Sequence, residues 1–217
     1  MTKERYLKIV AMLRRRQPDL TVIMEGVHKA HNLAAIARSC DAVGISDVHA
    51  ITSKKELGIK KGVAMGSNRW LDMHLHTSIG DIAMSLKNRG FQIIAADFNE
   101  RARDYRQPDY TRPTALVVGQ ELFGVSEETL ALADQSVFIP MKGMVQSLNV
   151  SVATAVVLYE AHNQREKAGM YGRSPEDERA FARVVFEKCY PRLAEQYRRR
   201  GEDYPELDNE GKIVKQA

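Results

Sequence analysis

The sequence predicts an α/β fold, with a parallel sheet at its centre and a helical arm at each end of the chain. Strand-like and helix-like segments alternate along most of the 217 residues, as in chains built from βαβ units. Two continuous apolar runs, Thr114–Val118 and Val137–Ile139, have the composition of strands buried on both faces. Basic segments with helical spacing at both ends indicate arms outside this core.

The first helix is predicted over residues 3–17, where apolar side chains recur every three or four residues before Pro18. After it the pattern changes repeatedly between strand and helix. Strands are predicted at 21–27, 47–51, 70–75 and 91–96, helices at 32–43 and 79–89, and a Lys/Gly-rich loop at 53–62.

The second half begins with a long polar connection at 99–113, which leads to the two apolar strands. Asn149 opens a long helix that runs to about Lys167. Residues 175–200 are again helical and basic, and the last 17 residues have the composition of a loosely ordered tail. We therefore predict a basic helical arm at 1–18, a main domain at 19–168, and a helical arm with a polar tail at 169–217.

The charge is distributed unevenly along the chain. Residues 1–17 carry six Lys/Arg against one acid and residues 162–200 carry ten against six, whereas residues 18–161 carry fourteen against sixteen. Clustered basic side chains neutralise phosphates, so this pattern favours a core whose arms meet a polyanion. Ordinary solvated helix faces are the alternative for each basic run taken alone.

Several classes of protein do not fit the sequence. No apolar run approaches the ~20 residues that span a bilayer, and the opening residues do not resemble a signal peptide. We therefore expect a cytoplasmic protein without a membrane segment. Cys40 and Cys189 are too few for a disulfide framework or a cysteine zinc site. Since no histidine pair is accompanied by further ligands, we expect no metal.

The first candidate motif is HKAHNLAAIARSCDAVG. Asn32 is predicted at the N-cap of a helix, and Arg38 follows six residues later, which rotates its side chain by about 240° around the helix. Arg38 would thus point away from Asn32 and reach over one edge of the sheet. The alternative is that Asn32 only caps the helix and Arg38 pairs with a nearby acid.

The second motif is LVVGQELFGVSEE, an apolar strand followed by Gly119, Glu121 and Gly124, with Ser126 placed to cap a helix. Its glycine spacing half-matches a phosphate-binding loop. The Lys-Ser/Thr pair of that loop is replaced by Val125-Ser126, and no G-x-G-x-x-G follows any predicted strand. A P-loop nucleotidase and a dinucleotide-binding domain are therefore disfavoured.

The third motif is FIPMKGMVQSLNVSVATAVVLYEA. Pro140 and Gly143 predict an irregular loop, whose free backbone groups could contact a ligand. Gln146, Ser147 and Asn149 gather where this loop meets an apolar helix. Ordinary capping of that helix by Ser147 or Asn149 is the alternative.

Together and in this order, the three motifs resemble the signature segments of the SPOUT superfamily of methyltransferases. The sequence RRRQPDLTV near the start and QREKAGMYGR after the third motif look like the TrmH-type tRNA (guanosine-2′-O)-methyltransferases. The resemblance covers nearly all of residues 5–173. It implies a Rossmann-like sheet whose C-terminal segment forms a deep trefoil knot, and a homodimer that shares residues between its two active sites.

The resemblance also implies a bent S-adenosyl-L-methionine held in the knot, and it assigns roles to particular residues. The implied catalytic residues are Arg38, Asn32, Glu121, Ser147 and Asn149. The implied cofactor-binding residues are Ala96, Gly119, Gly124, Ile139, Pro140, Met141 and Leu148. The arginines expected to contact RNA are Arg14, Arg15, Arg16, Arg165 and Arg173. Two departures are Ala30, where relatives usually have proline, and Ala96, where they often have a hydroxyl.

The reaction implied is methyl transfer to a ribose 2′-hydroxyl of tRNA, at guanosine 18 of the D-loop. The family proposal makes Arg38 the base, assisted by an RNA phosphate, yet a guanidinium normally stays protonated in proteins. A phosphate clamp beside the target ribose is the other interpretation of Arg38. The rival functions are methylation of ribosomal RNA and a non-catalytic RNA-binding role on the same fold.

Overall fold

The computed structural model describes residues 1–52, 70–120, 123–172 and 177–214, so the predicted loop at 53–62 lies outside the described residues. The chain divides into two compact units. The first, called the core unit below, is Gln17–Met170. The second, called the arm unit, combines Met1–Arg16 with Tyr171–Ala217. Residues from both ends of the chain therefore belong to one unit.

The described part of the core unit contains a seven-stranded sheet in which every pairing is parallel. Its strand order is β3-β2-β1-β6-β4-β7-β5, which confirms the predicted parallel α/β fold. The strands are β1 (Leu20–Glu25), β2 (Asp47–Ile51), β3 (Asp72–His76), β4 (Gln92–Ala96), β5 (Arg103–Asp104), β6 (Thr114–Val118) and β7 (Gln135–Phe138).

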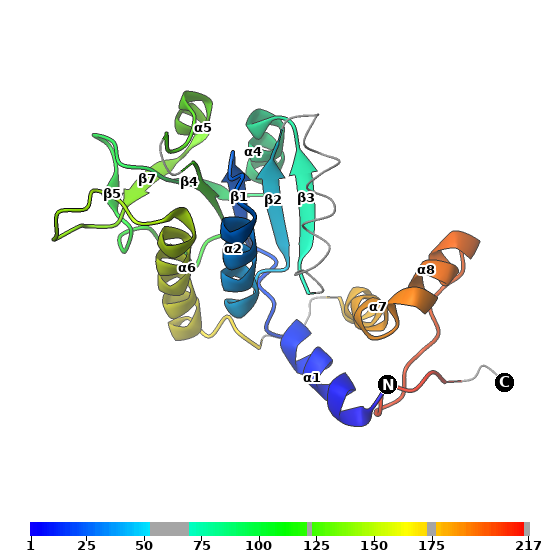
Figure 1. Cartoon of the computed structure of the whole chain (residues 1–217). Coiled ribbons are helices and arrows are strands. Elements are labelled where there is room, and N and C mark those ends of the chain that lie inside the picture. Colours follow the sequence, from blue (N-terminus) through cyan, green and yellow to red (C-terminus); the bar gives the residue numbers. More distant parts are fainter. Residues whose placement is uncertain (53–69, 121–122, 173–176, 215–217) are drawn as a thin grey trace. The chain divides into compact units, whose positions relative to one another are not determined.

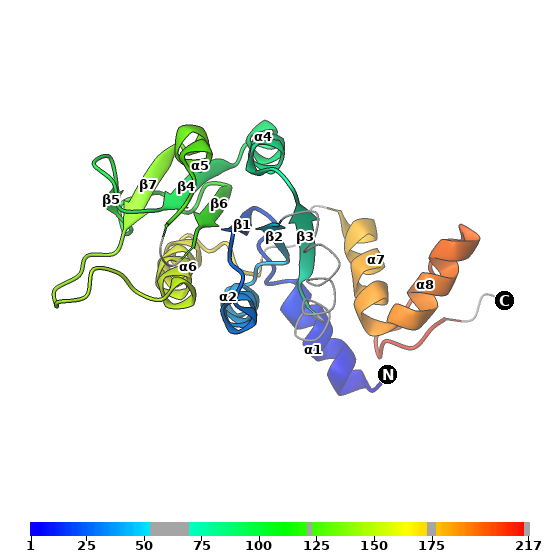
Figure 2. The same ribbon diagram turned by 45° about the horizontal axis from the view of Figure 1, so that its top comes forward.

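Helices cover both faces of this sheet. Figure 1 and Figure 2 show α2 (Ala30–Ala42) and α6 (Val150–Lys167) together on one face, and α4 (Ile79–Asn88) and α5 (Glu127–Leu132) on the other. Side chains of a strand point alternately to the two faces. Val22 and Met24 of β1 accordingly join the core under α2 and α6, while Ile23 joins the core under α4. The central strands are buried on both sides, as their apolar runs predict.

Two details of the core unit differ from the prediction. The two-residue strand β5 lies inside the segment expected to be one long connection, where it pairs with the end of β7. A two-residue strand leaves no periodic pattern to detect. Asn32 is not a helix cap, because α2 begins at Ala30 and Lys29 occupies the N-cap position. Ser126 does cap α5, since its side chain accepts a hydrogen bond from the backbone N–H of Thr129.

The arm unit consists of α1 (Lys3–Leu13), α7 (Glu178–Cys189) and α8 (Pro191–Arg200). Helix α7 packs against both of the others. The predicted helical segment at 175–200 is broken into two helices at Tyr190, whose backbone leaves the helical region directly before Pro191. None of the described helices is long and apolar enough to cross a membrane.

The expectation of a loosely ordered C-terminal tail is wrong as far as residue 214. The ring of Tyr204 stacks on Phe186 with centroids 4.8 Å apart. The hydroxyl of Tyr190 donates to the backbone oxygen of Gly211 at 2.7 Å, and Leu207 forms a β-bridge with Ile213. Aromatic stacking therefore fixes a segment whose polar composition suggested little order.

Candidate active site

The carboxyl ends of the strands lie along one edge of the sheet, because all the strands are parallel. In open parallel sheets, ligands bind beyond this edge, at the point where the strand order reverses. Here the reversal lies between β1 and β6. On one side of β1 lies β2, the next strand in sequence, and on its other side lies β6, which comes much later in the sequence. The loops that follow β1, β4, β6 and β7 meet around this point, and they contain most of the predicted site residues.

The loop after β6 has a backbone that only glycine permits. A Cβ on Gly119 would lie 1.9 Å from the backbone oxygen of Gly124. Gly124 has a φ of +64°, and a Cβ there would lie 2.4 Å from the carboxylate of Asp97. The backbones of Gln120 and Gly124 exchange two hydrogen bonds, of 2.8 and 3.0 Å. Glu121, between them in sequence, lies outside the described residues.

Three of the predicted cofactor-binding residues come together at this edge. Ala96, the last residue of β4, lies in register between Val118 of β6 and Val137 of β7. Gly119 follows Val118 directly, and Gly124 contacts Asp97, the next residue after Ala96. The structure thus places Ala96, Gly119 and Gly124 on neighbouring strand ends.

The loop after β7 carries the remaining predicted cofactor-binding residues, which are Ile139, Pro140, Met141 and Leu148. All four are half-buried. Within the described chain, no backbone group of residues 139–148 makes a hydrogen bond. Backbone donors and acceptors are strong groups that need partners when water is excluded. This segment therefore offers a row of unused backbone groups beside the strand ends.

Two asparagines connect the first and third motifs. The side-chain amide of Asn149 donates to the side-chain oxygen of Asn32 at 3.2 Å. The other end of the Asn149 side chain caps α6, because its oxygen accepts the backbone N–H of Ser151 at 2.9 Å. Asn32 is buried, and it lines a pocket of about 160 Å³ together with Gly119, Gln120 and residues of the β1–α2 loop. Asn149 thus both caps α6 and holds Asn32 in the candidate site.

Arg38 and Ser147 are both exposed. Arg38 lies six residues, or about 1.7 turns, after Asn32 on α2. Its guanidinium has no hydrogen-bond or ion-pair partner within the described part of the chain. The alternative in which Arg38 pairs with a nearby acid is therefore not found there. Ser147 lies at the end of the irregular loop, two residues before the cap of α6. Both side chains are available to a substrate.

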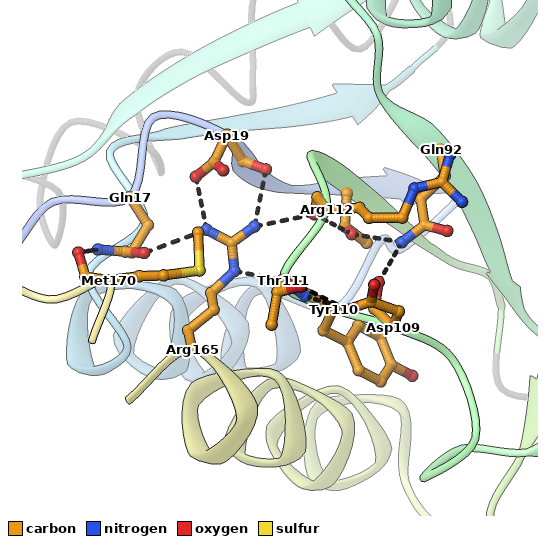
Figure 3. Close-up of polar contacts among 10 residues, drawn as sticks. Gln17, Asp19, Gln92, Asp109, Tyr110, Thr111, Arg112, Arg165 and Met170 are labelled. Carbon is orange, nitrogen blue, oxygen red and sulfur yellow. Dashed lines mark hydrogen bonds and ion pairs between the residues drawn. The ribbon is translucent and has the colours of Figure 1, made fainter. Parts of the chain in front are cut away.

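The prediction that Arg165 contacts RNA is wrong, because its side chain is fully buried. Figure 3 shows its guanidinium surrounded by acceptors from two segments, residues 17–19 and residues 110–112. It forms an ion pair with Asp19 and donates hydrogen bonds to the backbone oxygens of Asp19, Tyr110 and Arg112 and to the side chain of Gln17. No donor remains for a phosphate, so Arg165 supports the fold of the core unit instead.

The other predicted RNA contacts lie at the boundary of the arm unit or outside the described residues. Arg14 and Arg15 are exposed and Arg16 is half-buried. The guanidinium of Arg14 lies over the ring of Phe181, 4.9 Å from its centroid, and 3.9 Å from Glu178. Arg173 lies outside the described residues. Arg14 and Arg15 therefore present basic groups to solvent, as a surface contact with RNA requires.

Histidines gather on β2 and β3, away from these loops. His49 Nδ1 lies 3.0 Å from His76 Nε2, and His74 pairs with Asp47 at 2.7 Å. Burial, followed by the neighbouring imidazoles, lowers the pKa of His49 to about 3. Among the described residues, no group of three His, Cys, Asp or Glu side chains could hold a metal ion. Burial therefore keeps His49 neutral near pH 7 within this packed set of rings.

Sequence reasoning missed Glu25, the last residue of β1. One of its carboxylate oxygens accepts hydrogen bonds from the backbone N–H of Ser126, at 2.9 Å, and from the hydroxyl of Thr129, at 2.8 Å. The carboxylate therefore joins the end of β1 to the start of α5. The only signal in the sequence is an acid placed directly after the apolar run LTVIM, at the edge where ligands bind.

The chain is similar to known proteins along nearly its whole length. Residues 19–159 match the SpoU rRNA Methylase family, and residues 163–216 match the C-terminal region of SpoU rRNA methylases. A tRNA (guanosine(18)-2′-O)-methyltransferase from Escherichia coli strain K12 is 49% identical, with 100% of this chain and 96% of that protein covered.

Solved structures extend this similarity to three dimensions. A TrmH/SpoU tRNA modifying enzyme from A. aeolicus superposes with a TM-score of 0.78 at 41% identity, covering 87% of this chain and 96% of that one. The SpoU methyltransferase AviRb from Streptomyces viridochromogenes, in complex with the cofactor AdoMet, gives a TM-score of 0.57 at 27% identity, covering 70% and 62%.

Proposed function

The chain belongs to the SpoU rRNA methylase family, and from this premise we propose that it transfers a methyl group from S-adenosyl-L-methionine to the ribose 2′-hydroxyl of guanosine 18 in tRNA. The observation that carries the proposal is the full-length match to a tRNA (guanosine(18)-2′-O)-methyltransferase. That match includes both the core unit and the arm unit. It therefore favours tRNA over ribosomal RNA, although the family is named after the latter.

The residues present fit S-adenosyl-L-methionine. The backbone groups of residues 139–148, which have no hydrogen-bond partner among the described residues, could bind its adenine and amino-acid portions. Gly119 and Gly124 bring the neighbouring backbone close to the same edge of the sheet. Ala96 lacks the hydroxyl common in relatives, so its contact would come from backbone atoms. We assign Ala96, Gly119, Gly124, Ile139–Met141 and Leu148 to the cofactor site.

When bound, the cofactor supplies a methyl group on a sulfonium that is already activated for transfer. The protein has to align the ribose hydroxyl with this methyl group and accommodate the loss of the hydroxyl proton. We assign this task to Arg38, which is exposed and unpaired within the described chain. Its guanidinium would clamp the phosphate beside the target ribose and stabilise the developing negative charge; action as the base is the alternative.

The remaining motif residues hold this arrangement. Asn149 fixes the amide of Asn32 through their hydrogen bond, and Asn32 lies about 1.7 turns before Arg38 on α2. We propose that Asn32 and Asn149 position α2 against the third-motif loop, and that Ser147 contacts the RNA. Glu121, between the two glycines of the second motif, would order the cofactor loop.

We further propose that the chain is a homodimer. Large apolar side chains near the strand ends are strongly exposed, and exposed apolar patches mark interaction surfaces. Met144 is 99% exposed, Phe98 83% and Phe123 79%. Light scattering should give twice the 24.5 kDa mass of one chain. The SPOUT resemblance also supports a deep trefoil knot in the C-terminal part of the core, active sites that use both subunits, and a cytoplasmic location with the tRNA.

The arm unit would bind tRNA through phosphates. Arg14, Arg15 and Arg16 precede the core unit, and Arg173 follows it. Such contacts are independent of base sequence and weaken with salt. We therefore propose that the two arms predicted on either side of residues 19–168 form a single RNA-binding unit, built from both ends of the chain.

The decisive experiment is incubation with labelled S-adenosyl-L-methionine and unmodified tRNA, followed by mapping of the methylated nucleotide. We expect label at the 2′-oxygen of guanosine 18. Label in ribosomal RNA fragments, with none in tRNA, would favour the ribosomal alternative. Binding of tRNA without any transfer would favour the non-catalytic one.

A further inference from the structure

Glu25 contacts a loop of the proposed cofactor site, although it belongs to none of the three motifs. Its carboxylate lies at the end of β1 and accepts two hydrogen bonds on one oxygen, from the N–H of Ser126 and the hydroxyl of Thr129. Thr129 is buried, and Glu25 is half-buried. Hydrogen bonds to a carboxylate are stronger than those between neutral groups. The contact therefore holds the second half of the β6–α5 connection against β1.

The same strand end also contacts the first half of that connection. Gly26 follows Glu25 with a φ of +65°, and a Cβ there would lie 2.6 Å from the side-chain nitrogen of Gln120. Gln120 is in turn paired with Gly124 by two backbone hydrogen bonds. Glu25, the last residue of β1, and Gly26 directly after it thus touch both sides of the connection that contains Gly119 and Gly124.

A second carboxylate approaches the connection from the other neighbour of β6. Asp97, directly after β4, has a side-chain oxygen 3.4 Å from the backbone nitrogen of Val125. The connection is therefore held between the ends of β1 and β4. The hydrogen bonds of Glu25, at 2.9 and 2.8 Å, are shorter than that of Asp97, and one of them comes from the buried side chain of Thr129.

We propose that Glu25 is a positioning residue for cofactor binding: its carboxylate, through Ser126 and Thr129, keeps the described part of the β6–α5 connection, residues 119–120 and 123–126, in the conformation that receives S-adenosyl-L-methionine. This inference rests on the proposed function, which places the cofactor against Gly119 and Gly124. A connection that is already ordered does not lose conformational freedom when the cofactor binds, so the protein's affinity for the cofactor is higher. Glu25 itself touches neither the cofactor nor the RNA.

Three variants test this role in the full-length protein. Glu25→Ala removes both hydrogen bonds, Glu25→Gln keeps a neutral acceptor, and Thr129→Val removes one donor while preserving shape. The matched control is Asp134→Asn. Asp134 also accepts a backbone N–H, that of Ile93 at 2.7 Å, but it does so at the opposite end of the sheet. Cofactor Kd by calorimetry, KM and kcat with unmodified tRNA, and Tm are measured for each.

We expect Glu25→Ala to raise both the Kd and the KM for S-adenosyl-L-methionine about tenfold, the loss expected for a charge-assisted hydrogen bond at ~1.4 kcal/mol per factor of ten. At saturating cofactor, kcat should stay within about threefold, because the reacting groups are unchanged. Glu25→Gln should recover part of the affinity, and Thr129→Val should lose a smaller part of it. Asp134→Asn should lower Tm without changing Kd.

The inference is overturned if Glu25→Ala lowers Tm as the control does and leaves the cofactor Kd unchanged. A fall in kcat with an unchanged KM would also overturn it, since that is the pattern of a group acting in the transition state. If Glu25→Ala does not fold, the Kd values of Glu25→Gln and Thr129→Val decide. Failure of the proposed function is distinguishable, because the unaltered protein would then neither bind the cofactor nor methylate tRNA.

Discussion

Replacing Arg165 by alanine should destabilise the core unit more than any change to a surface arginine. The guanidinium is fully buried and makes five hydrogen bonds, one of them within an ion pair with Asp19. Removing one partner of a buried pair costs about 3–5 kcal/mol, because the other is left uncompensated. Asp19 retains 31% exposure of its side chain, so water would relieve part of this cost. We expect a loss of about 3 kcal/mol.

Urea unfolding followed by circular dichroism measures this loss. For a chain of this size, about 3 kcal/mol corresponds to a fall in Tm of roughly 6–12 °C. Arg165→Lys should recover part of the stability, because an ammonium keeps the charge but offers three donors instead of five. Arg199→Ala is the control, since Arg199 lies in an exposed surface pair with Glu195 and its loss should change stability little.

The outcome that refutes this reasoning is a loss for Arg165→Ala no larger than that for Arg199→Ala. A second readout separates a structural role from RNA binding. While it remains folded, Arg165→Lys should leave the salt dependence of tRNA affinity unchanged, because the side chain has no exposed surface for a phosphate. A flatter salt slope in this variant would restore Arg165 to the RNA contacts.

Three further predictions concern catalysis, pH and RNA binding. Arg38→Ala should bind S-adenosyl-L-methionine normally but lose methyl transfer by about two orders of magnitude or more, as measured in single-turnover assays; near-normal turnover contradicts its role. Burial lowers the pKa of His49 to about 3 from its ordinary 6.5. Between these two pH values the imidazole is therefore protonated in the unfolded chain and neutral in the folded protein. Stability should be full above pH 6.5 and fall as pH drops towards 3, by about 2 kcal/mol at pH 5; an equally steep fall in His49→Gln argues against this. Changing Arg14 and Arg15 to glutamine should weaken tRNA binding and reduce its salt slope by about one to two; an unchanged slope would move the RNA surface elsewhere.

The fold was predictable because its signals are periodic. The apolar runs of β6 and β7, the helical spacing of α1 and the Gly stop after α2 all correspond to observed elements. The two-residue strand β5 was not predictable, since it depends on pairing with β7 rather than on its own sequence. The order of the tail was missed for a similar reason, because it depends on Tyr204 meeting Phe186 in another element.

Prediction of the site was limited by contacts between distant segments. The three motifs identified Asn32, Gly119, Gly124 and Asn149, which the structure brings to one edge of the sheet. The prediction for Arg165 is wrong because the residue lies in the basic last turn of α6, where an arginine is expected to be exposed. Its position, four residues after the buried Ala161, extends the buried stripe of α6 and could have indicated burial. Glu25 gave no comparable signal.

The distance in sequence between Asp19 and Arg165 affects how the protein can fold during its synthesis. The two residues are 146 positions apart, which a ribosome needs roughly 7–30 s to cover at about 5–20 residues per second. Throughout that interval Asp19 lacks its ion-pair partner Arg165. During the first part of it, β1 also lacks its neighbouring strand β6, which has not yet been synthesised. Nascent chains released before residue 165 should therefore depend on chaperones, whereas slightly longer ones should complete the domain unaided.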